Sequence, residues 1–165
     1  MKKRILIPAV AALLVSVGSA HADDPPPVRE GLWSKHSETT ASPGNKRTEK
    51  RETVCRNHAY DQYARAQMKR SLGCSLSNES VNGATFTADM RCHIEGSTVD
   101  FKITAIYDGD TAVHTIGSAT FSPSVGGMSS QTTTIVENYI GSCPAGMRPG
   151  DTKGADGRIT NDWKH

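Results

Sequence analysis

Apolar and polar residues alternate along much of this chain with the two-residue period of β-strands. In the segment 85–94 every second residue is apolar, so one face of a strand is buried and the other is wet. Further strands are expected at 28–40, 47–55, 74–81, 99–107, 111–121 and 131–143. Asn82-Gly83 and Asp108-Gly109 are hairpin-turn signals. The pattern predicts a mainly β fold, an antiparallel curved sheet or partial barrel of about seven strands with one short helix.

The helix is expected directly after the second strand. Asn57 is a suitable N-terminal cap and Gly73 a suitable C-terminal cap. Five residues fall on one face at helical spacing: Tyr60, Tyr63, Ala64, Gln67 and Met68. A short amphipathic helix of this kind suits one face of a sheet.

The first 22 residues have the pattern of an export signal. Residues 2–4 are basic, 5–18 are apolar, and Ala20-His21-Ala22 offers a cleavage site after Ala22. We expect a periplasmic protein, with secretion as the alternative, and no transmembrane segment. The expected organisation is a signal peptide at 1–22, an extended proline-rich lead at 23–27 that does not pack, a single disulfide-bonded β-rich domain at 28–151, and a flexible tail at 152–165.

Removal of this signal would change the net charge. The chain has 19 basic and 17 acidic residues, and three of the basic ones lie in the signal, which leaves 16 against 17. The remaining basic residues concentrate between 46 and 70, where Lys50, Arg51 and Arg56 are candidate contacts for an anionic partner. A solvated strand and the polar face of a helix would have the same composition, and we favour that interpretation.

The four cysteines, Cys55, Cys74, Cys92 and Cys143, follow the signal and suit two disulfides in an oxidising compartment. Three pairings are possible. We favour Cys74–Cys92 with Cys55–Cys143, although a two-residue Asn82-Gly83 loop would turn Cys74 away from Cys92 and a three-residue loop would bring the two together. The rival Cys55–Cys74 bridge stays open. The spacings contain no Cys-x-x-Cys and do not suit zinc, so no metal is predicted.

Two histidines are candidates for chemistry. With a two-residue Asp108-Gly109 turn, His114 would lie opposite Ile103 on an apolar strand face, where partial burial would shift its pKa. His58 lies in the first helical turn, three residues before Asp61. A lone histidine on an apolar face more often has a structural role. The sequence also lacks a Gly-x-Ser-x-Gly motif, a phosphate-binding loop and the basic-aromatic pattern of nucleic-acid binders, so we expect no catalytic residue, no cofactor and no nucleic-acid partner.

Two segments stand near the ends of the expected domain: Glu30-Gly31-Leu32-Trp33, and the run from Gly141 to Asp151 with sequence GSCPAGMRPGD. They resemble the exported family named domain of unknown function 3617. Thr53-Val54-Cys55 before the helix, and Cys74 and Cys92 around a hairpin, are similar to further family features. The resemblance implies a small periplasmic or secreted protein and supplies no activity, ligand or catalytic residue.

The sequence therefore favours a non-enzymatic envelope protein that binds a small apolar ligand or an envelope protein partner. The threonine- and serine-rich strand faces and a loop at 122–130 are candidate contact regions. The alternatives are a basic-patch binder of anionic envelope components, or a small enzyme or inhibitor that uses His114 or His58.

Overall fold

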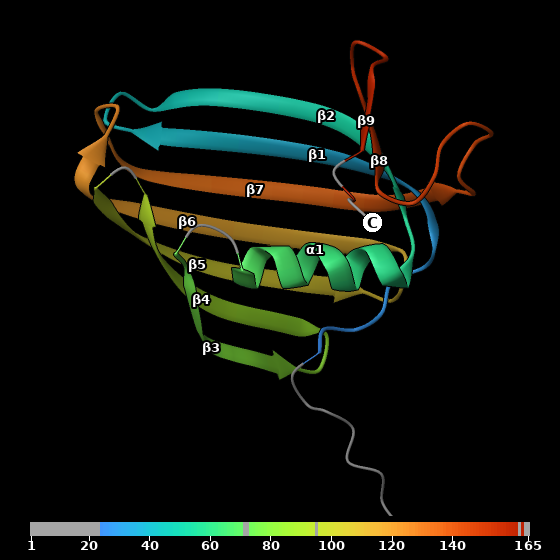
Figure 1. Ribbon diagram of the computed structural model, residues 1–165, viewed down its shortest axis with the longest axis horizontal. Coiled ribbons are helices and arrows are strands. Elements are labelled where there is room, and N and C mark those ends of the chain that lie inside the picture. The colour runs from blue at the N-terminus through green and yellow to red at the C-terminus, as the bar shows by residue number, and fades with distance from the viewer. Residues whose placement is uncertain (1–23, 71–72, 95, 162, 164–165) are drawn as a thin grey trace, which may run out of the picture.

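A computed structural model of the chain describes residues 24–70, 73–94, 96–161 and 163, so the predicted signal segment at 1–22 lies outside the described residues. The chain forms a single open antiparallel sheet, and one helix crosses one of its faces (Figure 1). The strand order is β3-β4-β5-β6-β7-β1-β2-β8-β9. The elements are β1 (Gly31–Ser42), β2 (Lys46–Arg56), α1 (His58–Arg70), β3 (Ser75–Asn82), β4 (Thr85–Ile94), β5 (Ser97–Asp108), β6 (Ala112–Val125), β7 (Met128–Gly141), β8 (Asp151–Gly154) and β9 (Ile159–Asn161).

The predicted fold class is confirmed, with a sheet that stays open and does not close into a barrel. Seven strands match the expected segments, and the two additional ones are β8 and β9. The expected loop at 122–130 is wrong, because β6 continues to Val125 and β7 starts at Met128, with only a Gly126-Gly127 turn between them.

The two faces of the sheet differ because side chains alternate along each strand. The inner face, which faces α1, carries two clusters of buried apolar residues. One contains Trp33 and Phe86, and the other contains Val99 with Cys92. The outer face carries polar residues and two half-exposed isoleucines, Ile106 and Ile116. This wide sheet therefore has two small cores on one face rather than one continuous core.

Helix α1 begins where the sequence predicts. The Asn57 side chain accepts a 2.8 Å hydrogen bond from the backbone N–H of Tyr60, which satisfies a donor that the first helical turn would leave unpaired. The helix then lies across the inner face of the sheet (Figure 1). Within the described residues, no helix combines the length and the apolar character that a bilayer crossing requires.

The end of the chain adds strands where a flexible tail is expected. β8 pairs with β2, and β9 pairs with β8. Buried Asp151 fixes this hairpin: it accepts hydrogen bonds of 2.7 Å from the Arg148 backbone N–H and 2.5 Å from the Asn161 amide. These bonds, first the backbone one and then that of Asn161, hold the pKa of Asp151 below its usual value. Trp163 packs near Tyr60 of α1, with ring centroids 6.0 Å apart.

The cysteines form two disulfides, Cys55–Cys143 with Cα atoms 5.6 Å apart and Cys74–Cys92 with Cα atoms 4.0 Å apart. These are the pairs that the sequence analysis favours, but the hairpin differs from both expected loops. Asn82 pairs with Thr85, and the register shifts between Ser77 and Ser80. This β-bulge moves the pairing by one residue and brings Cys74 opposite Cys92.

Two glycines in the family-like segments permit close contacts. Gly31 has φ 140°, and a Cβ there would overlap the Gly141 carbonyl oxygen and lie 2.8 Å from Tyr139 Cε2. Gly150 has φ 88°, and its backbone N–H donates a 2.8 Å hydrogen bond to the Cys55 carbonyl. Both segments therefore have a structural role at the end of the sheet where α1 begins.

Candidate functional site

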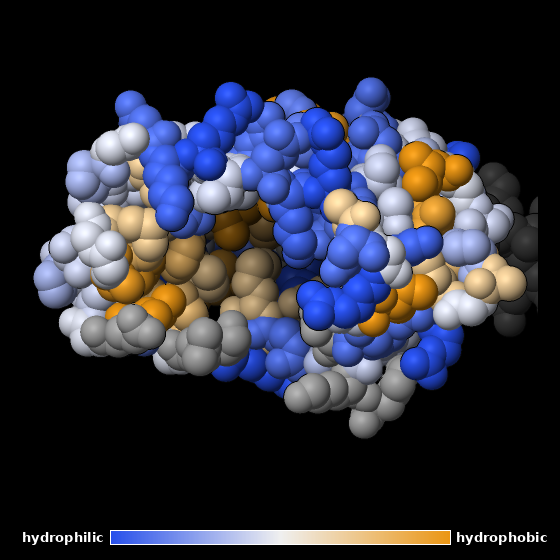
Figure 2. Space-filling model, turned by 90° about the horizontal axis from the view of Figure 1, so that it is seen from above, coloured by the Kyte–Doolittle hydropathy of each residue, from blue (hydrophilic) through white to orange (hydrophobic). Residues whose placement is uncertain are grey.

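A cavity of about 750 Å³ lies between α1 and the inner face of the sheet. Its floor comes from β4 to β7, and its other walls from α1 and residues 24–28. Members of both apolar clusters border it: Phe86 and Ala105 from one, and Ala119 from the other. Figure 2 shows a hollow with an apolar floor and a largely hydrophilic rim. The volume falls within the ~300–1,000 Å³ common for small-molecule sites.

The floor is hollow because small residues occupy the middle of the sheet. The strand register places three small residues on the sheet face that is directed toward α1: Ala105, Gly117 and Ala119. A Cβ placed on Gly117 would meet only the Thr133 carbonyl oxygen, at 4.0 Å. Large residues at these positions would fill the space below α1. The cavity is therefore encoded by the choice of small side chains.

Larger apolar side chains surround this small-residue floor. Phe101 and Ile103 reach the cavity from β5, Ile135 from β7 and Met68 from α1. The polar groups among them are uncharged, chiefly Gln131 and the threonines of β6 and β7. Thr133 already bonds the Thr39 hydroxyl at 3.0 Å and the Gln131 amide at 3.2 Å. The middle of the cavity thus suits an apolar molecule with few polar groups.

The proline-rich lead closes one side of the cavity. The sequence predicts an extended, unpacked lead, whereas Pro25 and Pro26 are half-buried and line the cavity. Asp24 forms an ion pair with Arg65 of α1. The Val28 carbonyl oxygen lies 3.0 Å from His58 Nε2. These contacts hold the lead beside the first half of the helix.

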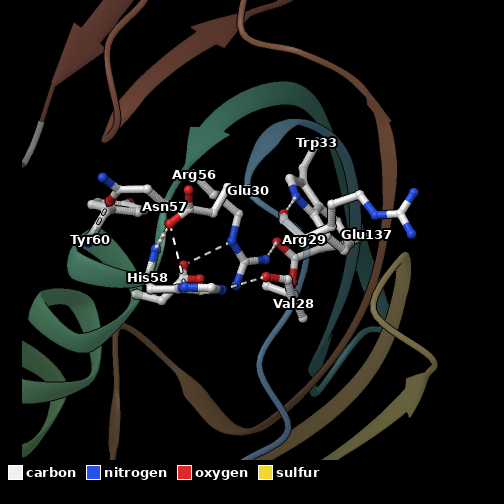
Figure 3. A network of polar contacts seen from close by, with 10 residues as sticks. Val28, Arg29, Glu30, Trp33, Arg56, Asn57, His58, Tyr60 and Glu137 are labelled. Carbon is white, nitrogen blue, oxygen red and sulfur yellow. Dashed lines mark hydrogen bonds and ion pairs between the residues drawn. The ribbon is translucent and has the colours of Figure 1, made fainter.

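A compact ionic cluster stands at the end of the cavity where α1 begins (Figure 3). The Arg56 guanidinium lies 2.9 Å from Asp61 and 3.3 Å from Glu137, and 5.1 Å from the centre of the Trp33 ring. Its side chain is only 17% exposed. Burial lowers the pKa of Arg56, but Glu137 and Asp61 outweigh that effect and raise it overall. Arg56 is therefore a permanently charged and fully engaged cation.

Tyr107 lies beside this cluster and also lines the cavity. Burial raises the pKa of its phenol, and the positive charge of Arg56 offsets this only in part. The hydroxyl therefore stays neutral at physiological pH. It adds an uncharged hydrogen-bonding group at the charged end of the cavity.

Arg56 also borders a second hollow, of about 720 Å³, between β2, α1 and the β8–β9 hairpin. This hollow is lined mainly by charged residues, among them Lys35, Lys50 and Glu52. Glu52 lies 2.6 Å from Lys50 and 3.3 Å from Lys35. Burial raises the pKa of Glu52, but the two lysines outweigh it and lower the pKa overall. The Arg56 cluster thus separates an apolar hollow from a charged one.

The structure pairs the candidate basic residues with carboxylates instead of gathering them into a patch. Lys50 pairs with Glu52, Arg51 with Glu49 at 2.5 Å, and Arg56 with its two acidic partners. These residues also point to different faces of β2, because Arg51 pairs with outer-face His36 and Lys50 lies one position away. The arrangement favours the interpretation of this basic block as a solvated, charge-balanced strand.

The two candidate histidines, His58 and His114, lie in different parts of the structure. The expected register for His114 is wrong: Asp108 pairs with Ala112, so a three-residue loop places His114 opposite Ile106. This puts it on the outer face, where it is exposed rather than partly buried. His58 borders the cavity instead, with Nδ1 3.4 Å from Glu30. The register does not bring His114 to the cavity.

The register also assembles a group that the sequence analysis missed. His36, Glu38 and Glu49 place potential ligand atoms within 4.8 Å of one another on the outer face. Only the β1–β2 pairing brings these positions together, so spacing along the chain gave no signal. Each carboxylate already has a guanidinium partner, Arg47 for Glu38 and Arg51 for Glu49, both at 2.5 Å. These partners disfavour a divalent cation.

The family described as protein of unknown function (DUF3617) matches residues 28–143. The match includes the segment around Gly31 and all four cysteines, and it stops before the remainder of the GSCPAGMRPGD run. No curated protein and no solved structure matches the chain.

Proposed function

This chain belongs to the family described as protein of unknown function (DUF3617), and we propose that it is a non-enzymatic binding protein of the cell envelope that holds a small apolar molecule between α1 and the sheet. The observation that carries the proposal is the cavity of about 750 Å³, which the protein's own side chains leave open. Removal of apolar ligand surface from water would drive binding.

We further propose that the protein acts in the periplasm after cleavage behind Ala22, with secretion as the alternative. Two features support this location. The first 22 residues have the pattern of an export signal. The two disulfides, Cys55–Cys143 and Cys74–Cys92, suit an oxidising compartment. In that setting, a carrier or sensor of apolar molecules would meet ligands that leave or enter the membranes.

The alternative functions have weaker support. An anionic-partner site needs unpaired cations, whereas Lys50, Arg51 and Arg56 all have carboxylate partners. An enzyme that uses His114 would need other polar groups around it in a cleft, and His114 is exposed on the outer face. An enzyme based on His114 therefore has less support than a binding protein.

A cavity-filling substitution tests the proposal. Gly117 has an ordinary strand conformation and open space above its Cα, so Gly117→Phe should be accepted by β6 while occupying the ligand volume. Ile116→Phe is the matched control, because Ile116 is the next residue and is 49% exposed on the outer face. The probe is N-phenyl-1-naphthylamine, an uncharged dye that fluoresces in apolar sites.

We expect saturable fluorescence with the native sequence and with Ile116→Phe, and affinity at least about tenfold weaker with Gly117→Phe. Circular dichroism and thermal unfolding establish that each variant is folded. Gly117→Val, which adds a smaller side chain with high strand propensity, serves if the phenylalanine variant does not fold. A folded Gly117→Phe protein that binds the dye like the native protein would overturn the proposal.

A further inference from the structure

The charges around the cavity determine which class of apolar molecule it accepts. Among the residues that the structure describes, two arginines border the cavity, and each has a carboxylate partner. Arg56 contacts Asp61 and Glu137, and Arg65 contacts Asp24. Three carboxylates thus face two guanidinium groups, which leaves one excess negative charge. A ligand that enters this space therefore meets no uncompensated cation among the described side chains.

His58 does not change this balance in favour of anions. Its Nε2 lies 3.0 Å from the Val28 carbonyl oxygen, and its Nδ1 lies 3.4 Å from Glu30. If both ring nitrogens carry a proton, each N–H faces one of these two acceptors, and the Glu30 carboxylate is itself negative. Figure 3 shows the His58 ring between these two acceptors, with Glu30 on one side and Val28 on the other. The histidine therefore supplies no vacant positive site for a carboxylate, phosphate or sulfonate.

An anionic group could bind Arg56 only by displacing one of its present partners. Asp61 and Glu137 are 24% and 18% exposed, so a displaced carboxylate would lose its cation while still largely removed from water. The alternative position, in the middle of the cavity, is lined by Phe101, Ile103 and Ile135 and offers an anion no charge compensation. Both of these positions are unfavourable for a negative headgroup, and at Arg65 an anion would have to compete with Asp24, a partner that is 77% exposed.

An uncharged polar group has suitable partners in the same space. The neutral Tyr107 hydroxyl lies at the charged end, and Gln131 and Thr133 line the floor. These groups can donate or accept hydrogen bonds to a hydroxyl, ester or amide without the desolvation of a charge.

We propose that the ligand is an uncharged lipid-like molecule, with an apolar body and at most an uncharged polar group, and that the Arg56–Asp61–Glu137 cluster excludes anionic amphiphiles such as fatty acids. The inference rests on the proposed function, since it names the class of molecule for the same cavity. Its physical basis is that, among the described wall residues, both arginines already have carboxylate partners.

A pair of dyes that differ by one charged group tests the inference. N-phenyl-1-naphthylamine is uncharged, and 8-anilino-1-naphthalenesulfonate carries a sulfonate on the same ring system. We expect the native protein to bind the uncharged dye at least about tenfold more tightly. In competition, dodecanol should displace that dye at lower concentration than dodecanoate does.

Glu137→Gln distinguishes exclusion of the sulfonate by charge from exclusion by its size, because the substitution removes the excess negative charge with almost no change in volume. The preference for the uncharged dye should fall by at least about threefold, through stronger binding of the sulfonate. Glu38→Gln is the matched control: Glu38 is a carboxylate on the outer face of the same sheet, paired with Arg47, and its removal should leave the preference unchanged.

The outcomes distinguish the two proposals. Absence of saturable binding of the uncharged dye to the native protein would refute the binding function itself. Equal affinity for both dyes would overturn only the selection against anions. A preference that Glu137→Gln leaves intact would also overturn it, because steric exclusion of the sulfonate would then explain the difference.

Discussion

Replacement of Arg56 by methionine should destabilise the protein much more than the loss of an exposed ion pair does. Methionine retains much of the apolar stem that packs near Trp33 but removes the charge. Asp61 and Glu137 would then lie about 80% removed from solvent without a cation, given exposures of 24% and 18%. Loss of one partner of a buried ion pair usually costs about 3–5 kcal/mol.

The lower end of that range applies, because the cluster keeps some contact with water. The guanidinium also lies 5.1 Å from the Trp33 ring centre, a contact that contributes about 0.5–1 kcal/mol. We therefore expect the free energy of unfolding to fall by about 3 kcal/mol. For a domain of this size, the midpoint of thermal unfolding should fall by about 9 °C.

Urea unfolding with the disulfides intact measures this change, and an unaltered slope would show that the unfolded state is not the cause. Arg47→Met is the matched control on the same strand, because the Arg47–Glu38 pair is exposed and should contribute little. Addition of Glu137→Gln to Arg56→Met should restore part of the stability. A loss below about 1 kcal/mol, or one no larger than the Arg47→Met loss, would show that Arg56 does not stabilise its two carboxylate partners in this way.

Two further predictions concern the disulfides and the C-terminal hairpin. The two disulfides close loops of 88 and 18 residues. Replacing both Cys55 and Cys143 with serine should therefore lower the free energy of unfolding by about 4.6 kcal/mol, and replacing both Cys74 and Cys92 should lower it by about 3.2 kcal/mol. Urea unfolding that shows the reverse order would contradict this dependence on loop length. Asp151→Asn should destabilise the protein near neutral pH. The difference in stability between the native protein and this variant should disappear as the pH falls below the lowered pKa of Asp151. The carboxylate's advantage is present above its unfolded pKa and lost on protonation, so a difference in thermal midpoint that stays constant down to pH 2 would contradict this assignment.

Local patterns predicted the strands and the helix well because each depends on residues close in sequence. Alternation identified β4 directly, and the cap at Asn57 located the start of α1. The hairpin registers were less accessible. A bulge near Asn78 and a three-residue loop after Asp108 each change the alignment by amounts that turn signals do not specify. For this reason the predicted position of His114, opposite Ile103, was wrong.

The cavity could not be predicted from the chain because it depends on which faces meet. Ala105, Gly117 and Ala119 are ordinary strand residues in sequence, and only the register places them together below α1. The pairing of charges has the same origin, since Arg56 reaches Glu137 across 81 positions of the chain. The small residues at alternate strand positions were visible in the sequence. Without knowledge of the neighbouring strands, however, they did not show that a cavity would form below α1.

The most direct test of the binding function is native mass spectrometry of the protein purified from cells that export it, with chemical analysis of any molecule released. We predict that the native sequence and Ile116→Phe carry an uncharged apolar molecule, and that Gly117→Phe carries none. A native protein that emerges empty, or a Gly117→Phe protein that retains the same molecule, would contradict the central claim that the hollow below α1 is a binding site.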